Sequence, residues 1–424
     1  MKKTLVLGLG LSGQAASALL LKRKEIVLGF DDDLKSKVHN LVHLLNQGIQ
    51  LISHLDDINF SDIKEIIISP GISLKHPVCL MALQLQIPIV GELSLAFRYL
   101  SQKTLGITGT NGKTTVTLFI EHLLSTNGHQ AKALGNVGVP LSGYVLEKDE
   151  NEILVMELSS YQIESLNQPV LDAAVILNIS PDHLDRYGHM EAYAQAKCMI
   201  THSLKEHSLL YVPQDLLINY SHLLKDERVV PYSLDEEPFI SSLSLPEYEK
   251  MNLLAAWRLT EWIGITEAQF LESWKSFNKP KHRIEFVREI NGIRFYDDSK
   301  GTNLDAVCKA VQSFDCPVIL IAGGVHKGAS YTYWIREEFK KVKKIVLLGS
   351  AKEFIYKDLT GFFDMIDANS MEEAVNIAFK EARKGEIVLL SPGCASFDMF
   401  KDYAERGERF KEKVNQLKEE IDKL

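Results

Sequence analysis

Short apolar runs alternate with longer amphipathic runs along almost the whole chain. Apolar runs of about four to eight residues are typical of buried strands, whereas apolar residues that recur every three or four positions indicate helices. Strands and helices in regular alternation predict an α/β fold whose sheets are largely parallel. The apolar runs, some with the turn that ends them, lie at residues 4–7, 26–30, 65–69, 88–90, 103–106, 153–156, 173–177, 318–324, 345–349 and 387–393.

The chain length and two breaks in the pattern predict three domains. At 424 residues the chain is longer than one hydrophobic core usually supports. The first alternating block ends near residue 93, and a basic, proline-containing segment at 278–283 marks a second break. We therefore expect a Rossmann-like domain at 1–93, a central P-loop ATPase-type domain with a mostly parallel sheet at 94–279, and a Rossmann-like α/β domain at 280–424.

Composition excludes several classes of protein. The 47 basic and 56 acidic residues give a net charge of −9, which argues against general affinity for nucleic acid or anionic membranes but leaves room for one basic pocket. No stretch approaches the length of a membrane span, and no cleavage site follows the first strand, so a cytoplasmic protein is expected. Five cysteines without Cys-x-x-Cys spacing indicate thiols in a reducing compartment: Cys79, Cys198, Cys308, Cys316 and Cys394.

The most informative motif is a glycine loop at residues 106–115, with the sequence Gly-Ile-Thr-Gly-Thr-Asn-Gly-Lys-Thr-Thr. It follows a strand-like run and opens a run with helical spacing, which is the setting of a phosphate-binding loop. Lys113 would reach the β- and γ-phosphate oxygens, and the Thr114 hydroxyl would hold Mg²⁺. The strict P-loop pattern has glycine where this chain has Ile107, so a glycine turn that only caps a helix is the alternative.

A second glycine loop, at residues 8–13, follows the first strand and opens a helix that is rich in alanine and leucine. The next strand ends on the acidic group Asp31 to Asp33, which can bind a ribose hydroxyl. Strand, glycine loop, helix and acid together predict a nucleotide site, with a structural turn as the alternative. The later segment Ser-Pro-Gly at 69–71 reads as a turn of the same domain.

Carboxylates and a histidine follow two buried strands of the central domain. Glu157 ends the run at 153–156, and Asp182, His183 and Asp185 follow the run at 173–177. Open α/β sheets bind ligands at the carboxyl ends of their strands, so Glu157 and His183 are candidate ligands of a second metal ion. Because Mg²⁺ prefers oxygen, His183 is equally consistent with a capping or hydrogen-bonding role.

The last domain places polar residues at strand ends, where they can converge on one cleft: Asp298, Lys300, Lys327 and Ser396. Arg283, at the preceding break, could clamp a phosphate or be solvated. The terminal run from 401 to 424 has the pattern of a charged amphipathic helix, for which a solvated face is the default explanation. Residues 205–250 have weak strand and turn signals and no assigned chemistry.

Seven motifs, in order over all three predicted domains, resemble those of the Mur ligase family, the ATP-dependent amino-acid ligases that build the peptidoglycan stem peptide. The motifs lie at residues 109–115, 135–138, 157–162, 178–186, 282–283, 298–303 and 391–396. The Asp-Asn-Pro-Arg signature of the diaminopimelate-adding member is absent, and so is the Asp-Gly-Ala-His-Asn-Pro phrase of folylpolyglutamate synthases. Where the family commonly has His-Asn-x-x-Asn beside the adenine, this chain has Tyr248, Glu249 and Asn252.

The resemblance implies a ligase that adds D-glutamate to UDP-N-acetylmuramoyl-L-alanine through an acyl phosphate. It implies ATP and two Mg²⁺ ions, with the UDP substrate bound by the first domain, ATP by the second and the amino acid by the third. Lys197 matches a lysine that the family carbamylates, which would turn an ammonium into an oxygen ligand near the metal. The implied partners are small molecules only, without nucleic acid or membrane, and a cytoplasmic monomer in peptidoglycan precursor synthesis is expected.

The residues that match the family motifs fall into four groups. The implied catalytic residues are Lys113, Glu157, His183 and Lys197, and the implied metal ligands are Thr114, Glu157, His183 and Lys197. The implied ATP contacts are Gly109, Thr110, Asn111, Gly112, Lys113, Thr114, Thr115, Asn252, Arg283 and Asp298. The implied substrate contacts are Gly10, Leu11, Ser12, Asp31, Ser69, Asn136, Ser159, Gln162, Lys300, Thr302, Lys327, Ser396, Phe397 and Tyr403.

Three other functions remain open at this stage. Another member of the superfamily would add L-alanine to UDP-muramate or glutamate to folate. A nicotinamide-dependent dehydrogenase could use the loop at 8–13, but it leaves the loop at 106–115 unexplained. A catalytically silent nucleotide-binding regulator would not need Lys113, Glu157, His183 and Lys197 together.

Overall fold

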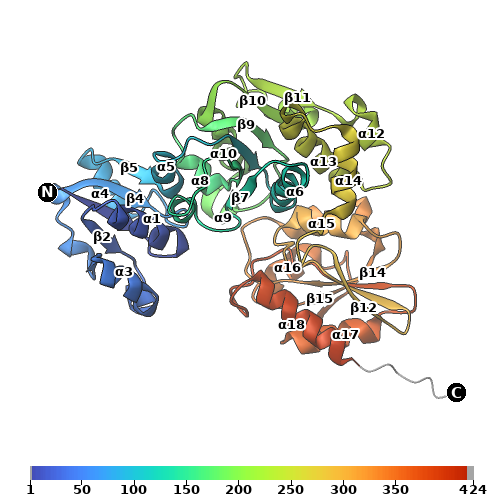
Figure 1. Ribbon diagram of the computed structural model, residues 1–424. Coiled ribbons are helices and arrows are strands. Elements are labelled where there is room, and N and C mark those ends of the chain that lie inside the picture. The colour runs from blue at the N-terminus through green and yellow to red at the C-terminus, as the bar shows by residue number, and fades with distance from the viewer. Residues whose placement is uncertain (1, 418–424) are drawn as a thin grey trace. The chain divides into compact units, whose positions relative to one another are not determined.

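The computed structural model describes residues 2–417 and has an α/β architecture built on three separate sheets (Figure 1). The predicted fold class, three domains with mostly parallel sheets, is confirmed. The chain forms two compact units, each with its own contacts. The first contains the chain up to Asn178 with Ala194–Ser241 and Met251–Phe277, and the second contains Ile179–Tyr193, Ser242–Lys250 and the chain from Asn278 onward. The predicted boundaries at 93 and 279 stay a prediction.

The first sheet has five parallel strands in the order β3-β2-β1-β4-β5. Its central strands are apolar on both faces, as expected for a parallel sheet covered by helices on both sides. The strands are β1 (Lys3–Leu7), β2 (Val27–Phe30), β3 (Gln50–Ile52), β4 (Ile63–Ile68) and β5 (Ile89–Gly91). The helices of this region are α1 (Leu11–Lys22), α2 (Leu34–Lys37), α3 (Val42–Gln47), α4 (Pro77–Gln84) and α5 (Glu92–Phe97).

The second sheet has six parallel strands in the order β11-β10-β9-β6-β8-β7. The segment with weak sequence signals supplies β10, a ten-residue strand. The strands are β6 (Thr104–Thr108), β7 (Ala131–Gly135), β8 (Ile153–Glu157), β9 (Leu171–Ile176), β10 (Leu204–Pro213) and β11 (Val229–Tyr232). The helices along this part of the chain are α6 (Lys113–Thr126), α7 (Leu141–Tyr144), α8 (Ser160–Glu164), α9 (Leu184–Tyr187), α10 (Met190–Cys198), α11 (Gln214–Asn219), α12 (Pro238–Ser241), α13 (Glu247–Thr260) and α14 (Glu267–Ser276).

The third sheet has the order β12-β13-β17-β14-β15-β16, with β12 and β13 antiparallel and the other pairs parallel. Alternate residues of one strand enter different cores, because side chains of a strand alternate between faces. In β14, Leu320 packs with α15 and α16, whereas Ile319 and Ile321 pack with α17 and α18. The strands are β12 (Glu285–Ile290), β13 (Ile293–Asp297), β14 (Val318–Ala322), β15 (Val342–Leu347), β16 (Met365–Asp367) and β17 (Ile387–Leu390), and the helices are α15 (Leu304–Gln312), α16 (Lys352–Leu359), α17 (Met371–Glu381) and α18 (Tyr403–Gln416).

Helix α18 departs from the solvated amphipathic helix expected from sequence. It packs beside α17 and the β12–β13 pair (Figure 1). Its inner face buries Phe410 and Val414 and also the guanidinium of Arg406. Residues 418–424 of the predicted helix lie outside the described residues. Within residues 2–417, no helix has the length and apolarity needed to cross a membrane.

Candidate active site

The phosphate loop connects β6 to α6 and turns through two glycines with positive φ. Gly109 has φ 149° and Gly112 has φ 91°, values that side chains with a Cβ rarely adopt. A Cβ at Gly112 would lie only 2.5 Å from Oδ1 of Asn252, so the loop packs directly against this residue of α13. The Lys113 ammonium donates to the carbonyl oxygens of Gly109 (2.8 Å) and Thr110 (2.9 Å). Its charge therefore lies within the loop, where phosphates would enter.

The loop is anchored from the next strand by Asn178, which follows β9. Its carbonyl accepts from the Thr110 N–H (2.9 Å), its Oδ1 accepts from the Asn111 N–H (2.8 Å), and its Nδ2 donates to the Asn111 carbonyl (2.9 Å). Ile107, the departure from the strict P-loop pattern, is fully buried within β6. The strand core thus explains this residue, and the turn begins at Gly109.

Glu157 ends β8 beside this loop. It is buried, and its Oε1 accepts from Asn136 Nδ2 at 2.8 Å, while its carbonyl accepts from the Asn136 N–H at 2.8 Å. Its other carboxylate oxygen, Oε2, is buried without a hydrogen-bond partner among the described residues. A buried carboxylate oxygen in this state is a good ligand for a hard cation, so the local chemistry fits Mg²⁺. Thr114, the second residue of α6, is also buried.

Lys197 is buried in α10, with only 1% of its surface exposed. Its Nζ donates to the Gly109 carbonyl at 2.9 Å, the same oxygen that accepts from Lys113. The position next to the phosphate loop excludes a surface lysine, which the sequence without its resemblance would have indicated. Lys197 therefore lies where a carbamate would add an oxygen ligand beside the loop.

Two predicted substrate contacts, Ser159 and Gln162, form a capping box at the start of α8. The Ser159 hydroxyl accepts from the Gln162 N–H at 3.3 Å, and Gln162 Oε1 accepts from the Ser159 N–H at 3.0 Å and from its hydroxyl at 2.9 Å. The side chains thus satisfy backbone groups of the helix end. The capping box accounts for the three-residue spacing of Ser159 and Gln162. A role in substrate binding remains a prediction.

The loop at residues 8–13 leads from β1 into α1. A Cβ on Gly13 would lie 1.8 Å from the Gly8 carbonyl, so the turn requires glycine there. Asp31, at the end of β2, accepts from the Leu9 N–H (2.6 Å) and from Lys37 Nζ (2.8 Å). Burial raises the pKa of Asp31, but these hydrogen bonds outweigh it and lower the pKa below its usual value. Asp31 therefore acts as an anionic anchor of the loop.

Other predicted UDP contacts lie around the same turn. The Ser69 hydroxyl donates to the Gly8 carbonyl at 2.8 Å, so the Ser-Pro-Gly segment takes part in shaping the loop. Leu11 is 80% exposed at the first turn of α1, preceded by Gly10 and followed by Ser12. A role of Gly10, Leu11 and Ser12 in binding UDP stays a prediction.

In the second unit, Asp182 pairs with Lys327. Lys327 Nζ lies 3.0 Å from Asp182 Oδ1 and 3.4 Å from the Thr302 hydroxyl, and Asn303 Nδ2 donates to Asp182 Oδ2 at 3.4 Å. A cavity of about 10 Å³ beside this pair is roughly the size of one water molecule. His183 follows with φ 55°, and its Nε2 lies 3.6 Å from Asp182 Oδ2. The lysine predicted to bind a substrate carboxylate thus already binds a carboxylate of the chain.

Arg283 and Asp298, predicted ATP contacts, influence each other electrostatically. Burial raises the pKa of Asp298 to about 7, although the hydrogen bond from Ser391 (2.7 Å) and the charge of Arg283 oppose the shift. The Arg283 Nε is buried without a hydrogen-bond partner among residues 2–417. The Arg283 Nε–H could therefore donate a hydrogen bond to a polar ligand, and the Asp298 carboxyl is a second polar group beside it.

The remaining amino-acid contacts lie on two loops that follow β13 and β17 and at the start of α18. Lys300 Nζ lies 4.9 Å from the centre of the Tyr403 ring, a cation–π contact. Ser396 is buried, and Phe397 beside it is 74% exposed. Arg406 joins the loops, because it donates to the Ser299 carbonyl (2.8 Å) and to the Cys394 carbonyl (3.1 Å).

Sequence reasoning assigned no site role to several residues that the structure places here. Asp182 was quoted only as part of a motif, and nothing in the sequence indicated its pairing with Lys327. Asp297 and Lys411 also gave no individual signal. Lys411 contacts Glu285, 126 residues away, and faces Asp297 from another element, so local pattern could not reveal these contacts.

Three family models match the chain in order. The MurD-like N-terminal domain of Mur ligases matches residues 2–91, the Mur ligase middle domain matches residues 107–254, and the Mur ligase glutamate ligase domain matches residues 282–394. The chain belongs to the Mur ligase family, whose members are ATP-dependent ligases. The resemblance inferred from sequence is confirmed.

Curated relatives and solved structures agree with this assignment. A UDP-N-acetylmuramoylalanine--D-glutamate ligase of Protochlamydia amoebophila is 44% identical over 437 residues, covering 98% of each chain. Proteins of the same name from Caldicellulosiruptor bescii and Chlamydia felis are 36% and 35% identical, with 98% of each chain covered. The fold matches a Thermotoga maritima MurF ligase solved with ADP (TM-score 0.61, 18% identity, 92% and 95% covered) and a Thermotoga maritima UDP-N-acetylmuramate-alanine ligase (TM-score 0.57, 18% identity, 98% and 99% covered).

Proposed function

We propose that this protein is an ATP-dependent ligase that joins D-glutamate to UDP-N-acetylmuramoyl-L-alanine through an acyl phosphate, as a cytoplasmic monomer in peptidoglycan precursor synthesis. The observation that carries the proposal is a similarity to D-glutamate ligases that extends over nearly the whole chain. The same stretch includes every residue of the proposed nucleotide and metal chemistry.

The phosphate loop would hold ATP. Its backbone N–H groups and the start of α6 favour anions, and the Lys113 ammonium already lies within the loop. Attack of the alanyl carboxylate on the γ-phosphate brings two anions together, so nearby positive charge lowers the barrier most. Lys113 would supply this charge at the γ-phosphate. Arg283, Asp298 and Asn252 are the proposed contacts to the rest of the nucleotide.

Mg²⁺ would neutralise and orient the phosphates when bound. The proposed ligands in the first unit are Thr114, Glu157 and carbamylated Lys197, and the buried, unpartnered Oε2 of Glu157 supports this set. Carbamylation also removes the cost of a buried ammonium at Lys197. His183 lies in the second unit, and its role as a ligand stays a prediction, as does the number of two ions.

The two substrates would bind to different sets of residues. Gly10, Leu11, Ser12, Asp31 and Ser69 would hold the UDP group, and Asn136, Ser159 and Gln162 would contact the muramoyl-alanine part. Lys300, Thr302, Lys327, Ser396, Phe397 and Tyr403 would bind D-glutamate. For a substrate carboxylate to reach Lys327, the Asp182 carboxylate must release it.

Phosphate release from ATP, measured with each amino acid and each UDP substrate in turn, tests this function. We expect release only when ATP, Mg²⁺, UDP-N-acetylmuramoyl-L-alanine and D-glutamate are all present. Release driven by L-alanine and UDP-muramate, or by glutamate and folate, would assign another member of the superfamily. Equilibrium sedimentation of the same protein checks the monomer.

A further inference from the structure

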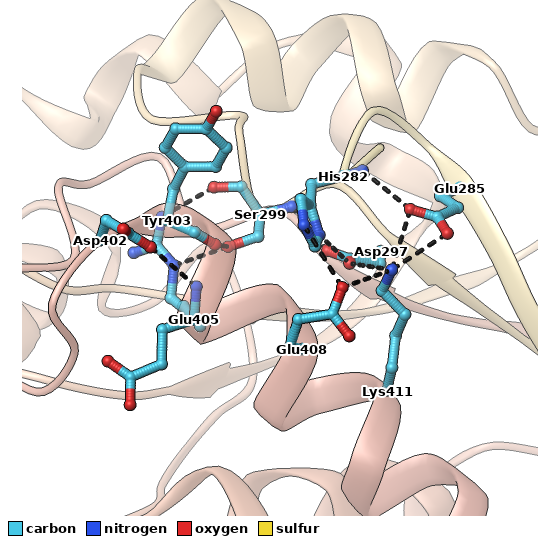
Figure 2. A network of polar contacts seen from close by, with 10 residues as sticks. His282, Glu285, Asp297, Ser299, Asp402, Tyr403, Glu405, Glu408 and Lys411 are labelled. Carbon is cyan, nitrogen blue, oxygen red and sulfur yellow. Dashed lines mark hydrogen bonds and ion pairs between the residues drawn. The ribbon is translucent and has the colours of Figure 1, made fainter. Parts of the chain in front are cut away.

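Five ionisable side chains meet between the β12–β13 pair and α18 (Figure 2). They are His282, Glu285, Asp297, Glu408 and Lys411, and we call them the α18 cage. Asp297 is fully buried and the His282 side chain is 6% exposed, whereas Glu285 and Glu408 lie nearer to solvent. The cage contains three carboxylates, so it needs positive charge to be stable.

The α18 cage has the composition of a metal site but is filled by a lysine. One ligand atom each from His282, Glu285 and Asp297 lies within 4.8 Å of the others, close enough to surround one cation. Lys411 Nζ lies 3.0 Å from Glu285 Oε1, 3.1 Å from Glu408 Oε1 and 3.9 Å from Asp297 Oδ2. Burial lowers the pKa of Lys411, but its hydrogen bonds to Glu285 and Glu408 outweigh burial and raise it. The resident cation is therefore an ammonium.

The cage is connected to the loop that carries Lys300. Glu285 accepts from the His282 N–H at 2.9 Å, and His282 Nδ1 lies 2.6 Å from Asp297 Oδ2. Asp297 Oδ1 accepts from the Ser299 N–H at 2.9 Å, and the His282 carbonyl accepts from the Lys300 N–H at 3.2 Å. Three hydrogen bonds, through His282 and Glu285, thus link Lys300 to the lysine of the cage.

The backbone at this point needs support. His282 has φ 62° and Ile284 has φ 50°, and a β-branched residue in the left-handed region is strained. Such conformations persist only where neighbouring residues stabilise them. Glu285 accepts a hydrogen bond from the His282 N–H, and Asp297 contacts the His282 ring. Helix α18 packs closely against the same ring, since a Cβ at Gly407 would lie 2.2 Å from His282 Nδ1.

Ordinary surface ion pairs do not account for this arrangement. Arg409, on the same helix, pairs with Glu405 and Glu412 in positions that are all about half exposed, and such pairs contribute little. Lys411 instead faces a carboxylate with no exposed surface. Removing its charge would leave Asp297, Glu285 and Glu408 facing one another.

We propose that Lys411 is a positioning residue for the amino-acid site: its ammonium is the built-in cation of the α18 cage, and by holding His282 and Asp297 it fixes the backbone of Ser299 and Lys300. The proposal rests on the proposed function, in which Lys300 binds a carboxylate of D-glutamate. Lys411 itself touches no substrate. Its loss should therefore weaken the binding of the amino acid most, with a smaller effect on ATP because the proposed ATP contacts Arg283 and Asp298 adjoin His282 and Asp297.

The first experiment compares Lys411→Met with Lys413→Met. Methionine keeps the apolar stem and removes the charge, and Lys413 lies on the same helix but pairs with Glu372 outside the cage. We expect Lys411→Met to raise KM for D-glutamate about tenfold, with KM for ATP and kcat changed less than about twofold. Lys413→Met should change none of the three. Equal losses in kcat and in both KM values, or an unchanged KM for D-glutamate, would overturn the proposal.

A double-mutant cycle tests the route through Glu285. Glu285→Gln removes one carboxylate of the cage at a partly exposed position, so this variant should fold even if Lys411→Met does not. It should raise KM for D-glutamate about threefold. If both residues act in one cage, the double variant is no worse than Lys411→Met alone. Effects that multiply, or a Glu285→Gln variant with normal KM, would contradict a shared cage.

The same cycle read by thermal unfolding separates this inference from the proposed function. Coupling between Lys411 and Glu285 in the unfolding midpoint requires no substrate. A wild-type protein without D-glutamate-dependent phosphate release would refute the proposed function, while a coupled midpoint would still support the cage. Additive shifts in the midpoint would refute the cage even in an active ligase.

Discussion

The phosphate loop and the α18 cage both hold a lysine in place, but they do so over very different distances along the chain. Lys113 donates to carbonyl oxygens three and four residues before it. Lys411 contacts Glu285, which lies 126 residues away. The loop is therefore a local device that a short sequence can specify, whereas the cage exists only once a helix from the end of the chain has packed on its sheet.

The difference also concerns what each lysine is for. In the proposed mechanism, the phosphate loop keeps its cation where an incoming anion would meet it, so the charge would be available for chemistry. In the cage, the ammonium of Lys411 instead pairs with carboxylates of the chain itself. Loss of the Lys113 charge should lower the catalytic rate with little effect on folding. Loss of the Lys411 charge should lower stability or weaken substrate binding, with little effect on the catalytic rate.

The largest expected effect is on the local side of the comparison. Lys113→Ala should lower the rate of phosphate release by about 10²–10³-fold, because the γ-phosphate loses its nearest positive charge. The unfolding midpoint should change little. Lys132→Ala, at an exposed position of β7, is the control and should keep full activity. An active Lys113→Ala variant would end the assignment of the loop as the ATP site.

The next effect is expected in the cage. Asp297→Ala removes the buried carboxylate that holds His282 and the Ser299 N–H, and breaking such a buried pair costs about 3–5 kcal/mol of unfolding free energy. Denaturant unfolding measures this loss. Glu337→Ala, which breaks an exposed ion pair with Lys340, should cost at most about 1 kcal/mol. Equal losses in the two variants would show that the cage stabilises the fold no more than an exposed ion pair does.

A pH experiment sharpens the comparison within the second unit. The pKa of Asp298 is about 7 in the folded protein because of burial, against 3.8 for an ordinary aspartate. Between these values the native state binds one more proton than the unfolded state, so the Asp298 contribution to stability is present below about pH 4 and is lost as pH rises to about 7. The free energy of unfolding should fall by up to about 4 kcal/mol over this window.

Asp298→Asn tests that contribution directly. The variant cannot release the proton, so its free energy of unfolding should lack this part of the pH dependence while sharing all other titrations with the wild type. The difference between the two proteins, measured by denaturant unfolding at several pH values, should grow as pH rises. A constant difference would mean that Asp298 titrates at its ordinary pKa.

The smallest effect concerns the pair between Asp182 and Lys327. Asp182→Asn removes the carboxylate that competes with the substrate for the lysine, while the amide oxygen can still accept a hydrogen bond. D-Glutamate should then bind about threefold more tightly, as measured by calorimetry with UDP-N-acetylmuramoyl-L-alanine present and ATP left out, so that no turnover occurs. Weaker binding would show that Asp182 aligns Lys327 instead of competing for it.

Much of the fold and part of the site could be predicted from the sequence. The alternation of apolar and amphipathic runs predicted an α/β fold with parallel sheets, and the loops at 8–13 and 106–115 were recognised because their glycines and strand–loop–helix setting lie within a few residues. The weak signals at 205–250 concealed β10, since its exposed polar residues interrupt the apolar pattern. Lys197 was recognised through a family motif, because nothing local shows that it is buried.

The sequence by itself determined the local elements and the phosphate loop, because strand and helix periods and glycine conformations are short-range properties. Only the tertiary structure decided which charges meet. It brought Lys411 to Glu285 and Asp297, Arg406 to Ser299, and Asp182 to Lys327. A buried carboxylate keeps its charge only beside a cation or hydrogen-bond donors, and the position of these groups depends on how distant segments pack, which no local pattern records.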